Sequence, residues 1–211
     1  MADNIYQEFE KFINENKGKR KFKQSVEVAV NFKNIDFSKQ ENRLNLEVLL
    51  PNGKGKESKV LLFANEKETI DKAKALGIEV ITQDELQSIA NDKKRLKQLL
   101  NYELYAQASM MPTIAKLLGP FLGPRNKLPK PILPNQDLKK LLDEAKRKIN
   151  IKTKGRFLPT VHFIIGKEDM DPKSLYENLE EALNAIKRKV GDNAIRSVYI
   201  KLTMSPSKRL I

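Results

Sequence analysis

The stretch "KVLLFANEKETIDKAKALGIEVI", residues 59–81, decides the architecture of the middle of the chain. It opens with the apolar run "KVLLFA", which is typical of a strand buried on both faces. "NEKETIDKAKALG" follows as a helix that ends at Gly77, and "IEVI" predicts a second strand. Strand, helix and strand at this spacing predict a βαβ unit with a parallel sheet.

The segments that follow extend this unit in the same style. "DELQSIANDKKRLKQLLN" predicts a helix, "YELYAQA" a strand and "MPTIAKLLGPFLG" another helix. "PRNKLPKPILPN" is rich in proline and lysine and predicts an extended loop. "QDLKKLLDEAKRK" predicts a closing helix. Residues 58–151 therefore indicate a small doubly wound α/β unit.

Both ends of the chain have a different pattern of apolar and polar residues. After a predicted helix over residues 3–15, Val26, Val28, Val30 and Phe32 alternate with polar residues, which predicts a strand with one buried and one wet face. A second strand is expected over residues 44–50, before the break "PNGKGK". The C-terminal piece supplies a strand (160–166), a helix and a last strand. In that last strand Val198, Ile200, Leu202 and Met204 are expected to point toward the core.

Neither end piece is large enough for a good core alone, since a chain below ~60 residues buries too little surface. Together they supply four strands and two helices. We expect a four-stranded sheet with both helices on one face, which is the split βαβ arrangement. Its other face would be open and polar. The fold class predicted is therefore α/β, with an α/β unit inserted into an α+β domain.

The composition favours a polyanionic partner. The 211 residues include 40 Lys and Arg against 27 Asp and Glu, a formal net charge of +13. This charge points to nucleic acid first and to an anionic membrane surface second. The absence of cysteine and the single histidine, His162, exclude disulfides, thiol chemistry and multi-histidine metal sites. No apolar run approaches the ~18 residues of a membrane span. We therefore expect a cytoplasmic protein that is not associated with a membrane and binds no cofactor.

Catalysis finds little support in the sequence. "GKGKES", residues 53–58, is close to the dinucleotide fingerprint, but a strand follows it where the fingerprint requires a helix. The carboxylates lie mostly on helix faces beside lysines, which is typical of solvated surfaces. We predict that the chain is not an enzyme. The alternative, a nucleotide-using enzyme built on the α/β middle, would be revealed by thermal stabilisation with nucleotides.

Basic residues form clusters along the whole chain. They lie at Lys17–Lys23, Lys93–Lys97, Arg125–Lys130, Lys146–Arg156 and Lys208–Arg209. Such clusters supply salt-dependent phosphate contacts with little sequence choice. Phe22, within "KRKFK", either packs under the sheet or offers an aromatic surface to unstacked bases. Beside an open polar sheet face these features favour RNA, with a DNA-binding chromatin or transcription factor as the alternative.

Four segments together resemble a known family. "KRKFKQSVEV", "LPNGKGK", "LGPFLGPRNKLPKP" and "YIKLTMSP" have the order and spacing of the large-subunit ribosomal protein of the mobile side stalk, the L-one family. The resemblance covers essentially the whole chain, and its length and "LPKP" form are similar to archaeal members. Two positions depart from the family pattern, because Asn126 and Ser205 stand where glycine is usual. Ser205 would either weaken binding through its added atoms or replace a water.

The resemblance implies a specific organisation and role. Residues 1–57 plus 152–211 would form a split βαβ domain that binds large-subunit ribosomal RNA, and residues 58–151 an inserted Rossmann-like three-layer α/β domain. The protein would be a structural part of the mobile stalk near the tRNA exit site and would assist release of deacylated tRNA. It would also repress translation by binding its own messenger RNA, and would be monomeric off the ribosome.

The resemblance also implies which residues face RNA. The hydroxyls of Ser25 and Thr203 and the carboxylate of Glu27 would hydrogen-bond 2′-hydroxyls and base edges. Motif by motif, the set carried over is Lys21, Phe22, Ser25, Glu27, Lys167, Ser197, Thr203, Met204 and Ser205.

Overall fold

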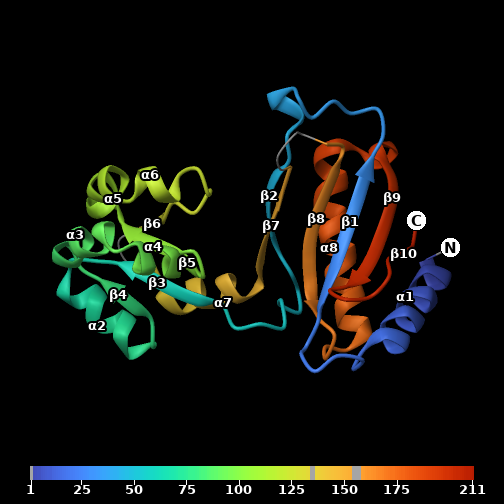
Figure 1. The fold of residues 1–211 in the computed structure, drawn as a ribbon, viewed down its shortest axis with the longest axis horizontal. Helices are drawn as coiled ribbons and strands as arrows, with labels where there is room; N and C mark the ends of the chain where they lie inside the picture. The colour runs from blue at the N-terminus through green and yellow to red at the C-terminus, as the bar shows by residue number, and fades with distance from the viewer. Residues whose placement is uncertain (1, 134–135, 154–157) are drawn as a thin grey trace. The chain divides into compact units, whose positions relative to one another are not determined.

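The computed structural model describes residues 2–133, 136–153 and 158–211. The chain folds into two compact units, one built from both chain ends and the other from the middle (Figure 1). The first unit takes residues up to 57 and from 146 onward, and the second takes residues 58–145. Residues 148–152, which the sequence placed mostly in the insertion, join the first unit because they form a strand that pairs with its chain.

The first unit is an antiparallel sheet with helices on one face. Its central sheet has the order β10-β9-β1-β8, so β1 from the N-terminal piece lies between two strands from the C-terminal piece. This interleaving is the split βαβ arrangement, and the predicted fold class is confirmed. The elements are α1 (Ala2–Asn16), β1 (Ser25–Phe32), η1 (Gln40–Asn42), β2 (Asn45–Leu49), β7 (Lys148–Lys152), β8 (Thr160–Lys167), α8 (Pro172–Val190), η3 (Asp192–Ala194), β9 (Ile195–Leu202) and β10 (Lys208–Arg209).

The predicted place of the second strand was wrong. β2 does not enter the four-stranded sheet but pairs antiparallel with β7, from Asn45 opposite Lys152 to Leu49 opposite Lys148. The fourth strand of the sheet is instead the short β10. β7 runs beside β8, and its buried Ile151 joins the same core. The β2–β7 pair therefore extends the apolar layer past the edge of the sheet.

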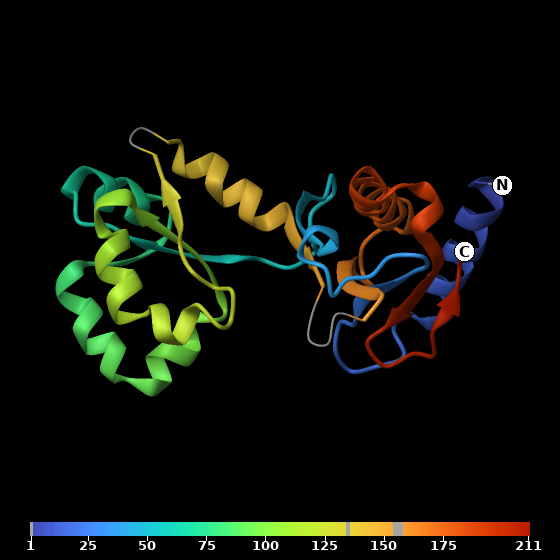
Figure 2. The ribbon, with the colours of Figure 1, turned by 90° about the horizontal axis from the view of Figure 1, so that it is seen from above.

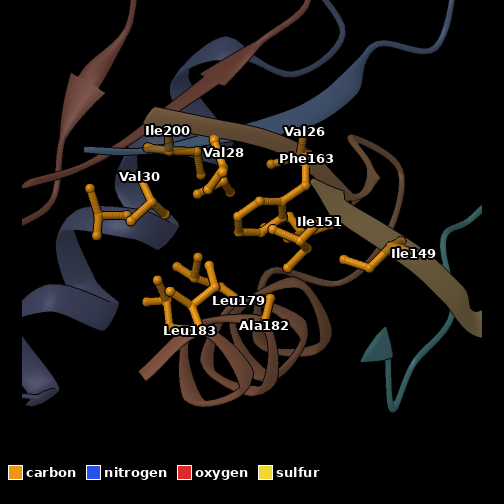
Figure 3. Close-up of a cluster of buried hydrophobic side chains, with 14 of the residues drawn as sticks. Val26, Val28, Val30, Ile149, Ile151, Phe163, Leu179, Ala182, Leu183 and Ile200 are labelled. Carbon is orange, nitrogen blue, oxygen red and sulfur yellow. The ribbon is translucent and has the colours of Figure 1, made fainter. Parts of the chain in front are cut away.

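The core of the first unit lies between the sheet and its helices. Val28, Phe163 and Ile200 project from β1, β8 and β9 toward the apolar stripe of α8, which includes Leu179 (Figure 3). Phe9 of α1 is fully buried in the same cluster. Each such side chain contributes about 1.5–3 kcal/mol when removed from water. Because both helices pack on this face, the opposite face of the sheet is left to solvent.

The second unit is a three-layer α/β structure. Its parallel sheet has the order β4-β3-β5-β6, with helices on both faces (Figure 2). Helices α3 to α6 pack on one face, and α2 and α7 pack on the other. The elements are β3 (Lys59–Phe63), α2 (Lys67–Ala75), β4 (Glu79–Ile81), α3 (Gln83–Asn91), α4 (Lys93–Leu99), β5 (Tyr102–Gln107), η2 (Ala108–Met110), α5 (Met111–Leu117), α6 (Gly119–Leu122), β6 (Lys130–Ile132) and α7 (Leu138–Arg147).

Three local predictions in this unit need correction. The first long helix divides into α3 and α4 at Asp92, whose carboxylate accepts from the backbone N–H of Lys94 at 2.8 Å and caps the new helix. The second divides into α5 and α6, because Pro120 has no N–H with which to continue α5. The expected loop contains β6, an edge strand in which Pro131 is tolerated. None of the helices formed by the described residues is long and apolar enough to cross a bilayer.

Candidate nucleic-acid interface

The solvent side of β8, β1 and β9, here called the open face, carries polar side chains together with the exposed Ile164. On β1 the half-exposed Glu27 and Asn31 alternate with buried valines, as the sequence predicted. Strand register places Ile164 of β8 and Lys201 of β9 on either side of Glu27. Within the described ranges the Glu27 side chain has no hydrogen bond or ion pair. Its carboxylate is therefore free to accept hydrogen bonds from a ligand.

At one edge of the open face, β1 begins where β8 and β9 end. The backbone N–H of Ser25 donates to Thr203 Oγ1 at 3.0 Å, and the Thr203 N–H donates to the Ser25 carbonyl at 3.2 Å. Lys167 Nζ donates to Ser25 Oγ at 2.9 Å. The fold thus brings together residues about 140–180 positions apart in sequence. We call Ser25, Lys167 and Thr203–Ser205 the strand-end cluster.

Ser205 directs its hydroxyl into the protein. Ser205 Oγ accepts from the Leu202 N–H at 2.8 Å and donates to the Pro206 carbonyl at 2.8 Å. Its backbone is not in the positive-φ region, so this position does not require glycine. The hydroxyl therefore stabilises the turn from within.

Two large apolar side chains are exposed here, one within the strand-end cluster and one in the loop before β1. Met204 is 56% exposed and Phe22 is 52% exposed. The prediction that Met204 points into the core was wrong, because β9 ends at Leu202 and the turn breaks the alternation. Phe22 does not pack under the sheet. Exposed apolar surface next to polar acceptors suits the faces of unstacked bases and sugars.

Ser197 is not part of this cluster. It lies on β9, six residues before Thr203, which corresponds to roughly 20 Å of extended chain. It is only 6% exposed, and its Oγ accepts from Asn31 Nδ2 at 3.0 Å. In that row the half-exposed Asn31, rather than Ser197, is presented on the open face. Lys21 is exposed in the loop before β1.

Two buried polar residues next to the cluster, Gln24 and Glu168, are not among the site residues predicted from the sequence. Gln24 is 1% exposed and Glu168 is 7% exposed. Gln24 Nε2 donates to Glu168 Oε2 at 3.0 Å, and Gln24 Oε1 accepts from the Met204 N–H at 2.9 Å. A signal was present, because continuing the alternation of β1 backwards from Val26 places Gln24 on the buried side. A polar residue there needs partners.

The loops beside the cluster carry an exposed ion pair. Lys23 Nζ contacts the carboxylate of Asp169, and both side chains remain substantially exposed. The hydrogen bond and charge of Lys23 lower the pKa of Asp169, and the same contact raises the pKa of Lys23. The pair joins the loop before β1 to the loop after β8. Lys23 is thus partly neutralised, whereas Lys19, Arg20 and Lys21 project into solvent.

Positive charge is concentrated in the first unit. By sequence, its residues 1–57 and 146–211 carry 26 basic against 16 acidic side chains, a net +10. Residues 58–145 carry 14 basic and 11 acidic side chains, a net +3. The unit that contains the open face therefore attracts polyanions more strongly than the inserted unit does. Residues 154–157, part of one predicted basic cluster, lie outside the described residues.

Some basic residues instead serve the fold. Lys127 Nζ donates to the Tyr102 carbonyl at 3.1 Å and lies 3.6 Å from the Glu103 carboxylate. Arg125 stacks over the Phe121 ring at 4.1 Å and donates to the Phe121 carbonyl at 2.8 Å. Both residues come from "GPFLGPRNK". That motif therefore fixes a loop of the second unit.

The glycines of "PNGKGK" also have a structural role. Asn178, fully buried in α8, donates to the Gly53 carbonyl at 2.9 Å and accepts from the Asn52 N–H at 3.0 Å. Gly55 has φ +62°, and a Cβ there would lie 2.7 Å from Met170 Sδ. The segment is thus a tightly packed turn.

Comparison with known proteins gives the family. A sequence profile described as the Ribosomal protein L1p/L10e family matches residues 11–206. The chain belongs to this family. It is 40% identical to the large ribosomal subunit protein uL1 of Methanothermobacter thermautotrophicus, over 91% of this chain and 92% of the relative. The uL1 protein of Thermococcus kodakarensis is 42% identical over 90% and 89% of the two chains, and that of Methanothrix thermoacetophila is 37% identical over the full length of both. These relatives are ribosomal proteins and not enzymes, as the sequence predicted.

Proposed function

We propose that the first unit binds large-subunit ribosomal RNA through the open face and the strand-end cluster. The observation that carries this proposal is the meeting of three features at one edge of the sheet. These are an unpartnered acceptor on Glu27, hydroxyls held in place on Ser25 and Thr203, and the exposed side chains of Phe22 and Met204. Family membership and the net charge of the unit support it.

Each part of the interface has a distinct chemical role. The Glu27 carboxylate accepts from 2′-hydroxyls or amino groups, which selects RNA over DNA where a 2′-hydroxyl is the donor. Phe22 and Met204 contact sugar and base faces. Lys19, Arg20 and Lys21 neutralise phosphates and supply the salt-dependent part of the affinity. A carboxylate near phosphates lowers the affinity for any RNA that offers it no donor, so Glu27 favours one arrangement over others.

The first test changes Thr203. Thr203→Val keeps the shape of the side chain but removes the hydroxyl that meets the Ser25 N–H, whereas Thr203→Ser keeps the hydroxyl. We expect Thr203→Val to weaken binding of a synthetic stalk fragment of large-subunit ribosomal RNA by about 1–3 kcal/mol, and Thr203→Ser to weaken it much less. Calorimetry measures affinity, and urea unfolding reports stability separately. Equal, wild-type affinity of both variants would remove the cluster from the interface.

Duplex DNA of the same length separates this proposal from a DNA-binding role. The stalk RNA should displace the DNA at equal concentration, and preference for DNA would overturn the proposal. Nucleotides should give no thermal stabilisation.

We further propose the finer roles that the family resemblance implies. These are a place in the mobile stalk near the tRNA exit site, assistance in the release of deacylated tRNA, and repression of translation through the protein's own messenger RNA. The same interface would serve ribosomal and messenger RNA, so the two RNAs should compete for one protein. Off the ribosome the chain would be a monomer, which sedimentation tests directly.

A further inference from the structure

The turn that carries Met204 is held by one buried side chain. Gln24 Oε1 accepts from the Met204 N–H at 2.9 Å, and Gln24 Nε2 donates to Glu168 Oε2 at 3.0 Å. The main chain of Gln24 also contacts Glu168, because the Glu168 N–H donates to the Gln24 carbonyl at 3.0 Å. Gln24 therefore links the start of β1, the loop after β8 and the turn after β9.

The arrangement fixes the orientation of the carboxamide. Glu168 is 7% exposed, and its Oε2 accepts from the Gly18 N–H at 3.4 Å as well as from Gln24 Nε2. A buried carboxylate is costly unless its hydrogen bonds are made, and Glu168 therefore favours the NH₂ side of Gln24. The carboxamide oxygen must then face the Met204 N–H, because the two ends of the amide are opposite in hydrogen-bonding character.

We infer that Gln24 is a positioning residue of the interface. It is 1% exposed and cannot contact RNA, but it sets the position of the turn from which Met204 projects. This inference rests on the proposed RNA-binding function. It adds that affinity depends on a buried Glu168–Gln24–Met204 chain of hydrogen bonds, which preorganises the turn before RNA arrives.

The experiment exchanges the two buried groups. Gln24→Leu removes both hydrogen bonds and should weaken binding of the synthetic stalk RNA roughly tenfold. Gln24→Glu alone places two carboxylates in contact and should also weaken binding. In the double variant Gln24→Glu with Glu168→Gln, the new carboxylate accepts from the Met204 N–H and from the new carboxamide. We expect it to recover affinity to within about threefold of wild type, since both central hydrogen bonds are restored.

Hydrogen exchange of the Met204 amide gives a readout that general stability does not. Its protection should be lost in Gln24→Leu and should return in the double variant. Gln107→Leu is a matched control, because Gln107 is a 7% exposed carboxamide of the second unit with four hydrogen bonds of its own. It should lower stability but leave RNA affinity unchanged.

The outcomes separate the inference from the proposed function. If Thr203→Val binds normally, the RNA site itself is misplaced. If Thr203→Val is weakened while a folded Gln24→Leu binds like wild type, Gln24 does not position the turn. A folded double variant that stays as weak as Gln24→Glu also overturns the inference, and so does an equal loss of affinity in Gln107→Leu.

Discussion

At the scale of single residues, the two departures from the family pattern have different physical meanings. Asn126 has φ +53°, in the left-handed region that most side chains avoid and that asparagine tolerates best after glycine. Glycine, which the resemblance leads us to expect at this position, suits the conformation for the same reason. Ser205 has no such backbone requirement, and its hydroxyl accepts a hydrogen bond within the turn. The first departure conserves a backbone shape, and the second adds an internal hydrogen bond.

Substitution of Asn126 tests the conformational argument. Asn126→Ala should lower the free energy of unfolding by about 1 kcal/mol, because alanine is strained at positive φ. Asn126→Gly removes the same side-chain groups but tolerates positive φ, so the glycine variant should be more stable than the alanine variant by about 0.5–1 kcal/mol. Urea unfolding measures both. A more stable alanine variant than glycine variant would contradict the argument.

The direction of single side chains could be predicted within the strands, where polar and apolar residues alternate, but not beyond the strand ends. Alternation placed Ser25 and Glu27 on the wet face and Val26 inside, as observed. It failed at Met204, where a turn replaces the strand. It would have identified Gln24 as buried, but only tertiary structure shows that Glu168, far away in sequence, is its partner.

At the scale of elements, most helices and strands were predictable from the sequence, but the short strands β6 and β7 were not. β7 follows α7 without a glycine or proline between them, and the sequence predicted a closing helix up to Lys148 but no strand in "KINIK". β6 has three residues, one of them proline, and exists because β5 offers it an edge to pair with. Both strands are determined by partners distant in sequence, which local propensity does not contain.

In the second unit, Gln107 at the end of β5 joins that strand to the start of α2. Gln107 Oε1 accepts from the Asn65 and Glu66 N–H groups at 2.8 and 3.2 Å, and Nε2 donates to Glu66 Oε2 and Thr69 Oγ1. Doubly wound sheets usually bind ligands at the carboxyl ends of such strands. Here the carboxamide already uses the backbone donors that a phosphate would need, so a nucleotide would have to displace it.

Gln107→Leu should therefore destabilise the second unit by about 1–3 kcal/mol, because it leaves buried donors without acceptors. Chemical unfolding followed by probes in each unit measures the effect. Amide signals from β5 report the second unit, and amide signals from β1 report the first unit. An unchanged midpoint in the second unit would show that the network contributes nothing to stability.

At the scale of the whole molecule, most of the net positive charge lies in the unit that we propose binds RNA. The composite first unit has a net charge of +10 and contains the open face, whereas the inserted unit has +3 and a sheet covered on both faces. Composition alone gave the total charge but not this partition. The strand β7 had to be seen pairing with β2 before Lys146, Arg147 and Lys148 could be assigned to the first unit.

The most direct test of the account is an NMR titration of the isotope-labelled full chain with the synthetic stalk RNA. We predict that the largest amide shifts fall on residues 19–27 and 199–205, where the loop before β1 and the end of β9 meet the open face. The solvent side of α8 and residues 58–145 should change little. Shifts confined to α8 or to the inserted unit, with residues 19–27 and 199–205 unchanged, would contradict the account.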